Sequence, residues 1–362
     1  MTFEDRYGWL DRLLHRTAFR AGTAQHALAD VEEMIYRDAL TDITVDHPVF
    51  ITALPRSGTT ILLRVLWDSG RFASHTYQDM PFVLCPLFWD QYTGQFGGEE
   101  TTRERAHGDG LQVSETSPEA FEEMVWKHFW PDHYRADRIR SWTAEDQNSE
   151  FNAFFETHMR KIIAVRQKGG GAGRSRYVSK NNLNIARLAA PPSPMRDGTV
   201  LIPFRDPVQQ AASMHRQHER FLEIHEEDDF VREYMEAIGH HEFGKGLKPV
   251  NFDGWLADAP SPDGLDFWLC YWIAAYRHVL RHAGDATHLV SYAQLTEAPE
   301  SALAQLARVV NVPEADLVSQ SDRLEPPRRH SVEEALPVSL RREATEVYDR
   351  LREQAAITSA PS

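Results

Sequence analysis

The sequence predicts an α/β fold in which a central parallel sheet carries helices on both faces. Apolar runs of strand length alternate with amphipathic stretches of helical length over most of the chain. Strands that alternate with helices pair in parallel through right-handed crossovers, and the helices then cover both faces of the sheet. With 362 residues, of which 42% are hydrophobic, the chain is long enough to bury such a core. This length suggests two domains or one large α/β domain, and we expect residues 1–362 to form a single domain, in which we find no internal repeat.

The first part of the chain predicts N-terminal helices followed by one strand–turn–helix unit. Residues 1–45 contain apolar side chains at helical spacing. The continuous apolar run 49–54 is typical of a strand that is buried on both faces. Residues 59–69 then predict a helix that stops at Gly70. Together, residues 48–70 form the strongest local pattern in the sequence.

Residues 75–170 predict a helical insert in the sheet-forming part of the chain. One helix is expected to begin at Ser117-Pro118, with proline in the first helical position, and to end near Pro131. A second is expected at 150–167. The glycine run 169–173 reads as a flexible link, because no strand precedes it as a phosphate-binding loop would require.

The alternation of strands and helices resumes in residues 176–310, and residues 311–362 are expected to form a C-terminal helical tail. Within these two parts we expect strands at 176–179, 200–204 and 287–291, and helices at 183–188, 207–226, 265–282, 299–310 and 337–354.

Charge and cysteine content exclude several classes of protein. The formal net charge is −15, so nucleic acid and anionic membranes are repelled and are not expected partners. An anionic ligand would need a local cluster of donors. The two cysteines exclude a disulfide scaffold and fit a reducing compartment. There is no secretory signal pattern and no run of eighteen uncharged apolar residues, so we expect a cytoplasmic protein without stable membrane insertion.

The turn after the first strand has the chemistry of an anion-binding loop. A helix N-terminus offers unpaired backbone N–H groups and the positive end of the helix dipole. Glycine lets the backbone approach an anion closely, hydroxyl groups add donors, and arginine adds a forked cation. All of these residue types coincide in the segment Pro55-Arg56-Ser57-Gly58-Thr59-Thr60.

This loop differs from the phosphate loop of nucleotide triphosphatases. That motif needs a lysine after its second glycine, and here Thr59 holds the position, while Ala53 replaces the first glycine. A nucleotide triphosphate is therefore a weaker candidate ligand. The cation has moved to Arg56, before the glycine.

A second basic residue leaves the sheet at the end of strand 200–204. Asp206 is a candidate N-cap, and Pro207 suits the first helical position. Arg205 is then expected at the carboxyl edge of the sheet, where ligands bind in open α/β folds. Ser213 lies about two turns into the helix, on the order of 10 Å along its axis, so Arg205 and Ser213 can hold one phosphate together.

These segments resemble those of sulfotransferases that use 3′-phosphoadenosine 5′-phosphosulfate (PAPS). The segment 55–60 resembles their 5′-phosphosulfate loop, and the spacing from Arg205 to Ser213 resembles their 3′-phosphate-binding segment. The segment 290–295 is similar to the one whose tyrosine, here Tyr292, lies near the adenine. The resemblance covers about residues 48–310 and implies the P-loop-like sulfotransferase architecture.

The resemblance implies transfer of a sulfuryl group from PAPS to an acceptor hydroxyl, with release of 3′-phosphoadenosine 5′-phosphate (PAP). Arg56 is expected to stabilise the oxygen that leaves on the 5′-phosphate. Lys180, after the strand at 176–179, is expected to neutralise the sulfuryl oxygens, although a solvated lysine fits the same pattern. An arginine at position 56, where many cytosolic members have lysine, resembles the members that act on proteins and carbohydrates. The implied PAPS-binding residues are Arg56, Ser57, Gly58, Thr59, Thr60, Arg205, Ser213 and Tyr292.

The sequence does not single out one catalytic base. Asp79 is favoured, since similar members place a carboxylate some twenty residues after the loop, and His107 in a glycine-rich stretch comes second. His75, Glu115 and Glu119 are further candidates. Each of these five residues is also a plausible surface or capping residue.

The sequence does not identify the acceptor or the binding partners. A small molecule or a glycan is expected, with a carbohydrate or a lipid-linked sugar as candidates, and the oligomeric state is not predicted. Helical histidine pairs such as His278 with His282 lack a third ligand, so no metal is expected. Arg328-Arg329 either contacts the nucleotide or lies in a solvated turn. The competing functions are a P-loop kinase and a catalytically silent PAP-binding protein of the same fold.

Overall fold

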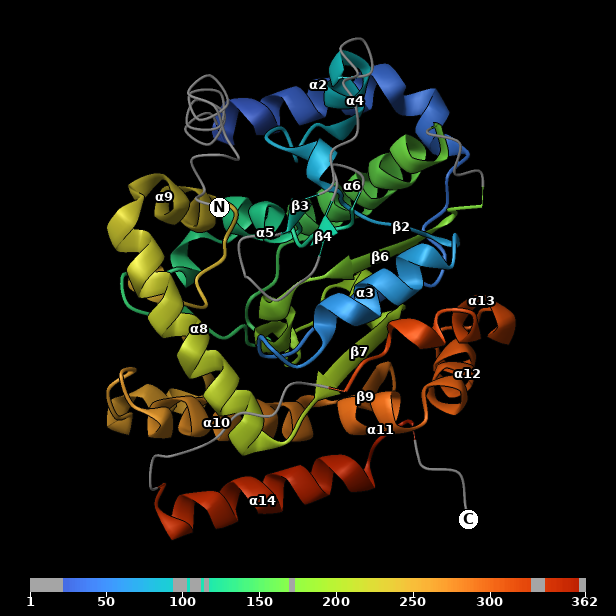
Figure 1. Cartoon of the computed structure of the whole chain (residues 1–362). Coiled ribbons are helices and arrows are strands. Elements are labelled where there is room, and N and C mark those ends of the chain that lie inside the picture. Colours follow the sequence, from blue (N-terminus) through green and yellow to red (C-terminus); the bar gives the residue numbers. More distant parts are fainter. Residues whose placement is uncertain are drawn as a thin grey trace.

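The computed structural model describes residues 22–93, 103–104, 112–113, 117–168, 173–326 and 336–357. Its centre is a five-stranded sheet in the order β2-β6-β1-β7-β9, and every neighbouring pair of strands is parallel (Figure 1). Helices surround this sheet, which confirms the predicted α/β class. The strands are β1 (Val49–Ile51), β2 (Phe72–Ala73), β6 (Arg176–Lys180), β7 (Thr199–Phe204) and β9 (Thr287–Ser291).

Both faces of the sheet are apolar and covered. Side chains alternate between the two faces along each strand. Phe50, Val200 and Ile202 belong to one buried cluster, and their neighbours Val49 and Leu201 belong to the other. Such two-sided burial explains why residues 49–54 form an unbroken apolar run rather than an alternating one.

The helices divide between these two clusters. The smaller cluster is closed by α3 (Thr59–Asp68), α12 (Pro299–Val309) and α13 (Glu314–Val318). The larger cluster is closed by α5 (Glu123–Phe129), α6 (Ser149–Lys168), α8 (Pro207–Glu227), α10 (Leu265–His282) and α14 (Val338–Glu353).

Shorter elements complete the described chain. Two small sheets pair β3 (Arg103–Glu104) with β4 (Gln112–Val113) and β5 (Ile139–Arg140) with β8 (Val250–Asn251). The remaining helices are α2 (Gly22–Thr41), α4 (Pro86–Thr93), α7 (Ser193–Arg196), α9 (Asp229–Ala237), α11 (Tyr292–Glu297), and the 3₁₀ segments η2 (Tyr77–Asp79), η3 (Pro131–His133), η4 (Asn182–Arg187), η5 (Gly244–Gly246), η6 (Phe252–Asp258) and η7 (Ser321–Arg323).

The predicted helix start at Ser117-Pro118 is wrong. Thr76 and Pro118 form an antiparallel bridge instead, and α5 begins only at Glu123. The backbone around Pro118 is used for this pairing, since Tyr77 N donates to Ser117 O and Glu119 N donates to His75 O. The predicted helix at 183–188 is the 3₁₀ segment η4. The predictions for His107, Glu115 and Arg328-Arg329 lie outside the described residues.

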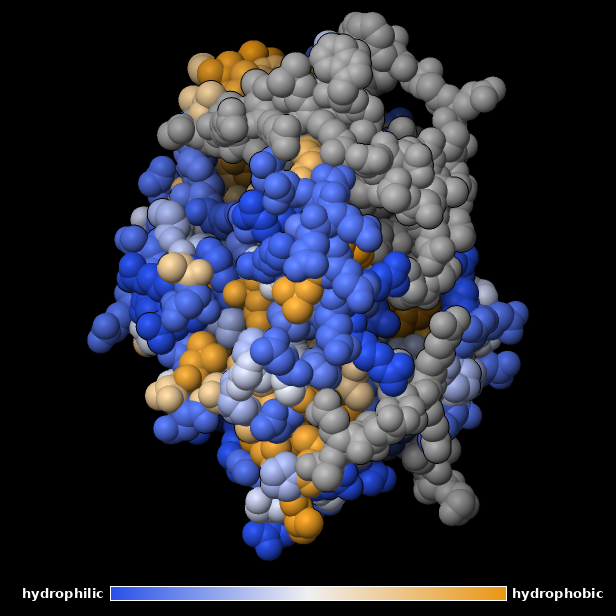
Figure 2. Space-filling model, turned by 60° about the vertical axis from the view of Figure 1, so that its left-hand side comes forward, coloured by the Kyte–Doolittle hydropathy of each residue, from blue (hydrophilic) through white to orange (hydrophobic). Residues whose placement is uncertain are grey.

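Within the described part of the chain, no helix is both long and apolar enough to cross a lipid bilayer. The face that carries α8 and α9 is dominated by hydrophilic side chains, with scattered apolar ones between them (Figure 2).

Candidate functional site

The site lies at the carboxyl edge of the parallel sheet, where the strand arrows in Figure 1 run toward the side that carries α8. The turn from β1 into α3 has two left-handed residues, Arg56 at φ 68° and Gly58 at φ 105°. The conformation of Gly58 directs the chain into α3, of which it is the N-cap. The backbone N–H groups at the start of this ten-residue helix therefore face the edge of the sheet.

Hydroxyl groups of this loop also lie at the edge. The Ser57 side chain is completely buried, and its Oγ has no hydrogen-bond partner among the described residues. A buried polar atom without a partner is unusual and indicates a place for a ligand or water. Thr59 Oγ1 donates to Asn182 Oδ1 at 3.4 Å, and Thr60 is half-buried.

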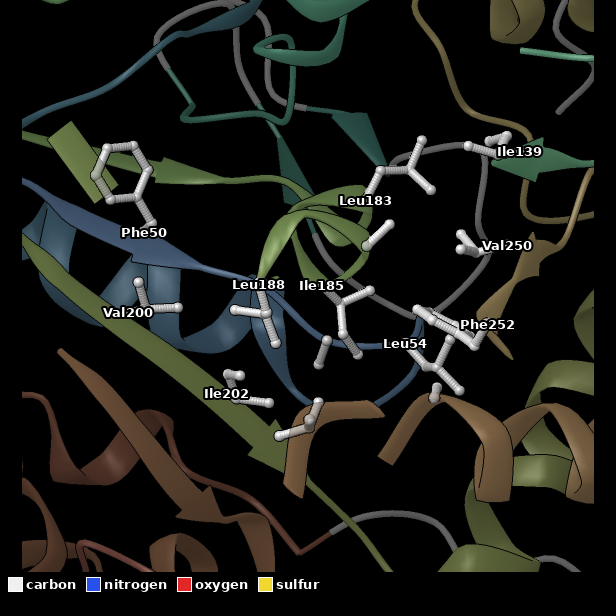
Figure 3. Close-up of a cluster of buried hydrophobic side chains, with 14 of the residues drawn as sticks. Phe50, Leu54, Ile139, Leu183, Ile185, Leu188, Val200, Ile202, Val250 and Phe252 are labelled. Atoms are coloured by element: carbon white, nitrogen blue, oxygen red, sulfur yellow. The ribbon is translucent and has the colours of Figure 1, made fainter. Parts of the chain in front are cut away.

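The loop is held from the protein interior. Gln210 of α8 donates from Nε2 to Leu54 O and Pro55 O at 3.3 and 3.0 Å, and its Oε1 accepts from Trp272 Nε1 at 3.0 Å. The Leu54 side chain lies in the apolar cluster beneath, near Phe252 (Figure 3). These contacts fix the backbone before Arg56 and leave the following residues to face the edge.

The second basic segment meets this loop. Asp206 caps α8, since its carboxylate accepts from Gln209 N at 2.9 Å, and Pro207 occupies the first turn as predicted. Arg205 therefore leaves β7 beside the loop and donates from a terminal nitrogen to Arg56 O at 2.9 Å. Arg56 Nε in turn donates to Ser213 Oγ at 3.2 Å. The structure thus brings Arg56, Arg205 and Ser213 together.

Tyr292 closes one side of this group. Its ring lies against Gly58, where an added Cβ would fall 2.3 Å from Tyr292 Cδ2. The Arg205 guanidinium lies 5.6 Å from the ring centroid, within reach of a cation–π contact. Burial lowers the pKa of Arg205, Tyr292 counteracts this change and Arg56 adds to it, but a guanidinium stays charged at neutral pH. Burial also raises the pKa of Tyr292.

Lys180 lies at the same edge on the neighbouring strand. It is the last residue of β6, which pairs with β1, and only 7% of its surface is exposed. The chain continues as Asn181, whose N–H donates to Ile51 O at 2.9 Å and thereby extends the pairing with β1. Lys180 and the loop therefore leave adjacent strands in the same direction, as the sequence predicts.

Asp79, the favoured base candidate, is buried and paired with a cation. Its carboxylate pairs with Arg166, accepts from Thr76 N at 2.8 Å and lies 3.5 Å from His75 Nδ1. Burial alone would raise the pKa of Asp79, but Arg166 and His75 outweigh it and hold that pKa well below the ordinary value. Such a buried, paired carboxylate is a poor proton acceptor, so this geometry disfavours the predicted base role.

Other base candidates are also engaged in the fold. His75 is buried and lies beside His158, with 3.2 Å between their Nε2 atoms. Glu119 accepts from Tyr77 OH and from Ala120 N. The aromatic side chains of α5 and α10 contribute to the core, with Trp126, Trp268 and Trp272 almost fully buried. Among the described residues, no three His, Cys, Asp or Glu side chains cluster as a metal site would require.

Two carboxylates that the sequence did not reveal lie beside this edge. Glu123 forms a fully buried ion pair with Arg187 and also accepts from Asn181 Nδ2 at 2.7 Å. Glu242 is half-buried and accepts from Asn182 Nδ2 at 3.0 Å. Their partners are about 60 residues away in the sequence, so no local spacing indicates these contacts.

The fold is α/β of the P-loop-like class, with a tight turn that contains Arg56 and Gly58 between the first strand and its helix. A family model described as "Sulfotransferase family" matches residues 48–316. Because this match spans well over half of the chain, the protein belongs to the sulfotransferase family. Members of this family are transferases, and the fold and family predicted from the sequence are confirmed.

Solved structures show distant similarity. Sulfotransferase STF9 from Mycobacterium avium is 15% identical, with 88% of this chain and 81% of that chain covered and a TM-score of 0.49. Sulfotransferase STF1 from Mycobacterium tuberculosis H37Rv is 14% identical, with 94% and 85% covered and a TM-score of 0.47. Retinol dehydratase in a complex with retinol and PAP is 10% identical, with 87% and 84% covered and a TM-score of 0.33. No curated protein sequence matches.

Proposed function

We propose that the protein transfers a sulfuryl group from PAPS to a hydroxyl group of a small molecule or glycan and releases PAP. The observation that carries this proposal is the meeting of two strand ends: Arg205 contacts the Arg56 carbonyl, and Arg56 contacts Ser213. A ligand with phosphate groups at both its 5′ and 3′ positions suits a site with one cation from each strand end. The family match supports the same activity.

The residues at the edge fit such a cosubstrate. The loop offers the buried Ser57 hydroxyl, which has no protein partner among the described residues, and the N–H groups that begin α3. Thr59 and Thr60 add hydroxyl groups beside them. These donors would hold the 5′-phosphate, while Arg205 and Ser213 would hold the 3′-phosphate. Tyr292, packed on Gly58, would contact the adenosine between them.

Positioning and charge stabilisation would provide most of the catalysis, as in phosphoryl transfer. Arg56 would stabilise the oxygen that leaves on the 5′-phosphate. The Arg56 side chain reaches Ser213 in this structure, so it would exchange this hydroxyl for an anion. Lys180 would neutralise the sulfuryl oxygens from the adjacent strand.

Ligand-induced thermal stabilisation tests the proposal. A bound ligand raises the melting temperature by mass action, so PAP should stabilise the protein more than AMP or ATP with Mg²⁺ does at equal concentration. Arg205→Ala should weaken PAP binding at least tenfold, because a charge-assisted hydrogen bond contributes about 1.5–3 kcal/mol, and should leave AMP binding within twofold. A preference for ATP would favour the kinase, and equal PAP and AMP binding would refute the proposal.

Turnover separates an enzyme from a silent binding protein. Arg56→Ala should lose most of the PAP release from PAPS even at saturating PAPS, a loss of roughly 10²–10³ in kcat. Binding of PAP without any turnover of PAPS by the wild-type protein, across an acceptor screen, would instead support the silent PAP-binding alternative.

A further inference from the structure

We propose that Glu242 is the general base that takes the proton from the acceptor hydroxyl. The inference rests on the proposed function, and it assigns a catalytic role to a residue that no sequence pattern marked. Four features of the structure lead to it: the connection of Glu242 to the loop, its accessibility, the rigidity of its backbone, and its lack of a cationic partner.

Glu242 is joined to the phosphosulfate loop through one side chain. Asn182 donates from Nδ2 to Glu242 Oε1 at 3.0 Å and accepts at Oδ1 from Thr59 Oγ1 at 3.4 Å. Thr59 is the first residue of α3 and follows Gly58 directly. The Glu242 carboxylate is thus two hydrogen bonds away from the loop that would hold the sulfuryl donor.

Glu242 and the Asn182 side chain that connects it to the loop can both be reached from solvent. Asn182 and Glu242 are half-buried, whereas Asp79, Glu122 and Glu123 are almost fully buried. Asn182 also follows Lys180 by two residues, so Glu242 lies on the side of the site where we expect the sulfuryl oxygens to be neutralised. An acceptor that enters here would meet a carboxylate.

The backbone around Glu242 is held in place by α8. His218 Nδ1 accepts from Gly244 N at 3.0 Å, and His225 Nδ1 accepts from Lys245 N at 3.2 Å. On the other side of Glu242, His241 O accepts from Lys248 N at 2.8 Å. The loop between α9 and η5 therefore presents the carboxylate in a defined position, which proton transfer in a transition state requires.

Among the described residues, Glu242 forms no ion pair, in contrast to Asp79 with Arg166 and Glu123 with Arg187. Its hydrogen-bond partner Asn182 is a neutral amide. No cation of the described chain therefore neutralises the Glu242 carboxylate, and one of its oxygens can accept a proton.

Titratable groups near Glu242 lie on α10 and on the loop itself. Burial raises the pKa of Tyr271 of α10, and the negative charge of Glu242 raises it further, so the Tyr271 side chain is neutral. On the loop itself, burial lowers the pKa of His241 to about 3, and Lys127 of α5 and Lys248 add to this effect. His240 also lies on the loop, and Lys245 follows it in η5, where it pairs with Glu226 at 3.8 Å. Tyr271 and His241 are thus uncharged at neutral pH and do not compensate the charge of the Glu242 carboxylate.

The step balances as follows. The acceptor O–H gives its proton to a Glu242 oxygen while its own oxygen forms the new bond to sulfur. The bond from sulfur to the bridging oxygen of the 5′-phosphosulfate breaks, and its electron pair stays on the phosphate oxygen beside Arg56. Glu242 afterwards releases the proton to solvent.

The test compares Glu242→Gln with the wild type and with Glu227→Gln, a control that makes the same change at an exposed position at the end of α8. PAP formation from PAPS is measured in water alone and with 4-nitrophenol or 4-methylphenol as the acceptor. We expect Glu242→Gln to lose roughly 10²–10⁴ in kcat with 4-methylphenol, to lose less with the more acidic 4-nitrophenol, and to lose the acidic limb of the pH profile. PAP affinity should not fall, because the variant removes a negative charge near the loop, and the melting temperature should stay unchanged.

Glu227→Gln should retain turnover within twofold. Turnover by Glu242→Gln within threefold of the wild type, or an equal loss with both phenols, would overturn the base assignment while leaving the proposed function intact. Failure of the wild-type protein to bind PAP, or PAP binding without PAP formation from PAPS in any arm, would overturn the transfer function and the base assignment with it.

Discussion

Replacement of Gly58 by alanine tests whether the loop conformation and the Tyr292 contact act together. Gly58 has φ 105° and ψ 9°, a left-handed conformation that costs an L-residue about 1–2 kcal/mol. The added Cβ would also lie 2.3 and 2.6 Å from Tyr292 Cδ2 and Cε2, and overpacking of this kind costs roughly 1–3 kcal/mol. We therefore expect a loss of about 2–5 kcal/mol in the free energy of unfolding.

The chain contains a matched control for this substitution. Gly254 has φ 83° and ψ 9°, and nothing lies within 4 Å of an added Cβ there. Gly254→Ala should therefore show the backbone cost alone. With the entropy of unfolding typical for 362 residues, 1 kcal/mol corresponds to about 1.3 °C in Tm. Calorimetry should show a Tm lower by about 1–3 °C for Gly254→Ala and by about 3–6 °C for Gly58→Ala.

The double variant Gly58→Ala/Tyr292→Ala separates the two contributions. If the ring is what the new methyl group meets, the double variant should lose at least 1 kcal/mol less than the sum of the single losses. PAP stabilisation should fall in Gly58→Ala and stay unchanged in Gly254→Ala. Equal melting temperatures for the two glycine variants, together with unchanged PAP binding, would contradict this account of the loop.

Two predictions concern stability. Glu123→Gln leaves Arg187 charged, completely buried and without its ion pair, so it should cost roughly 3–5 kcal/mol and lower the calorimetric Tm by about 4–7 °C. Glu343→Gln breaks the exposed pair with Arg277 and should lower Tm by about 1 °C or less, and similar losses in the two variants would contradict the importance of burial. The second prediction is loss of stability in acid: burial lowers the pKa of His278 to about 4 and of His241 to about 3, below the value near 6.5 expected in the unfolded chain. The folded state disfavours the charged form, so their contribution is fully present above pH 6.5 and is lost as the pH falls through 6.5 toward these values, by up to about 1.4 kcal/mol per pH unit for each histidine. Tm should therefore decline between pH 6.5 and 4.5, and His278→Asn should flatten this decline; an unchanged slope would show that His278 is not kept neutral by burial.

The sequence predicted the sheet and the meeting of the two basic segments at its edge because both depend on local patterns. A buried strand, a capped helix start and their connecting turn each lie within about twenty residues, and the strand ends of a parallel sheet meet at one edge. Arg56, Arg205 and Ser213 were therefore brought together correctly. The left-handed conformation of Arg56 was not predicted, since it depends on contacts such as that with Arg205.

The helix α2 shows that periodicity can predict a helix without predicting which face is buried. Val31, Met34 and Ile35 have helical spacing, but they are 41%, 62% and 63% exposed. The buried face instead contains Glu32, which pairs with Lys161 at 3.0 Å and accepts from Phe88 N at 2.7 Å. A paired buried carboxylate satisfies its hydrogen bonds, and this polar contact orients the helix against its apolar pattern.

The surroundings of the candidate bases could not be predicted because their contacts join distant segments and because carboxylates look alike in the sequence. Asp79 and Glu123 are neutralised by Arg166 and Arg187. This pairing has an electrostatic consequence for a chain with a net charge of −15, since an unpaired carboxylate beside an anion-binding loop would weaken the binding of a phosphorylated ligand. Glu242, held by a neutral amide near that loop, carries this cost in the described structure. A carboxylate in such a place is hard to explain by stability or by binding, and it is explained if its charge is removed by the proton of the acceptor as the reaction proceeds.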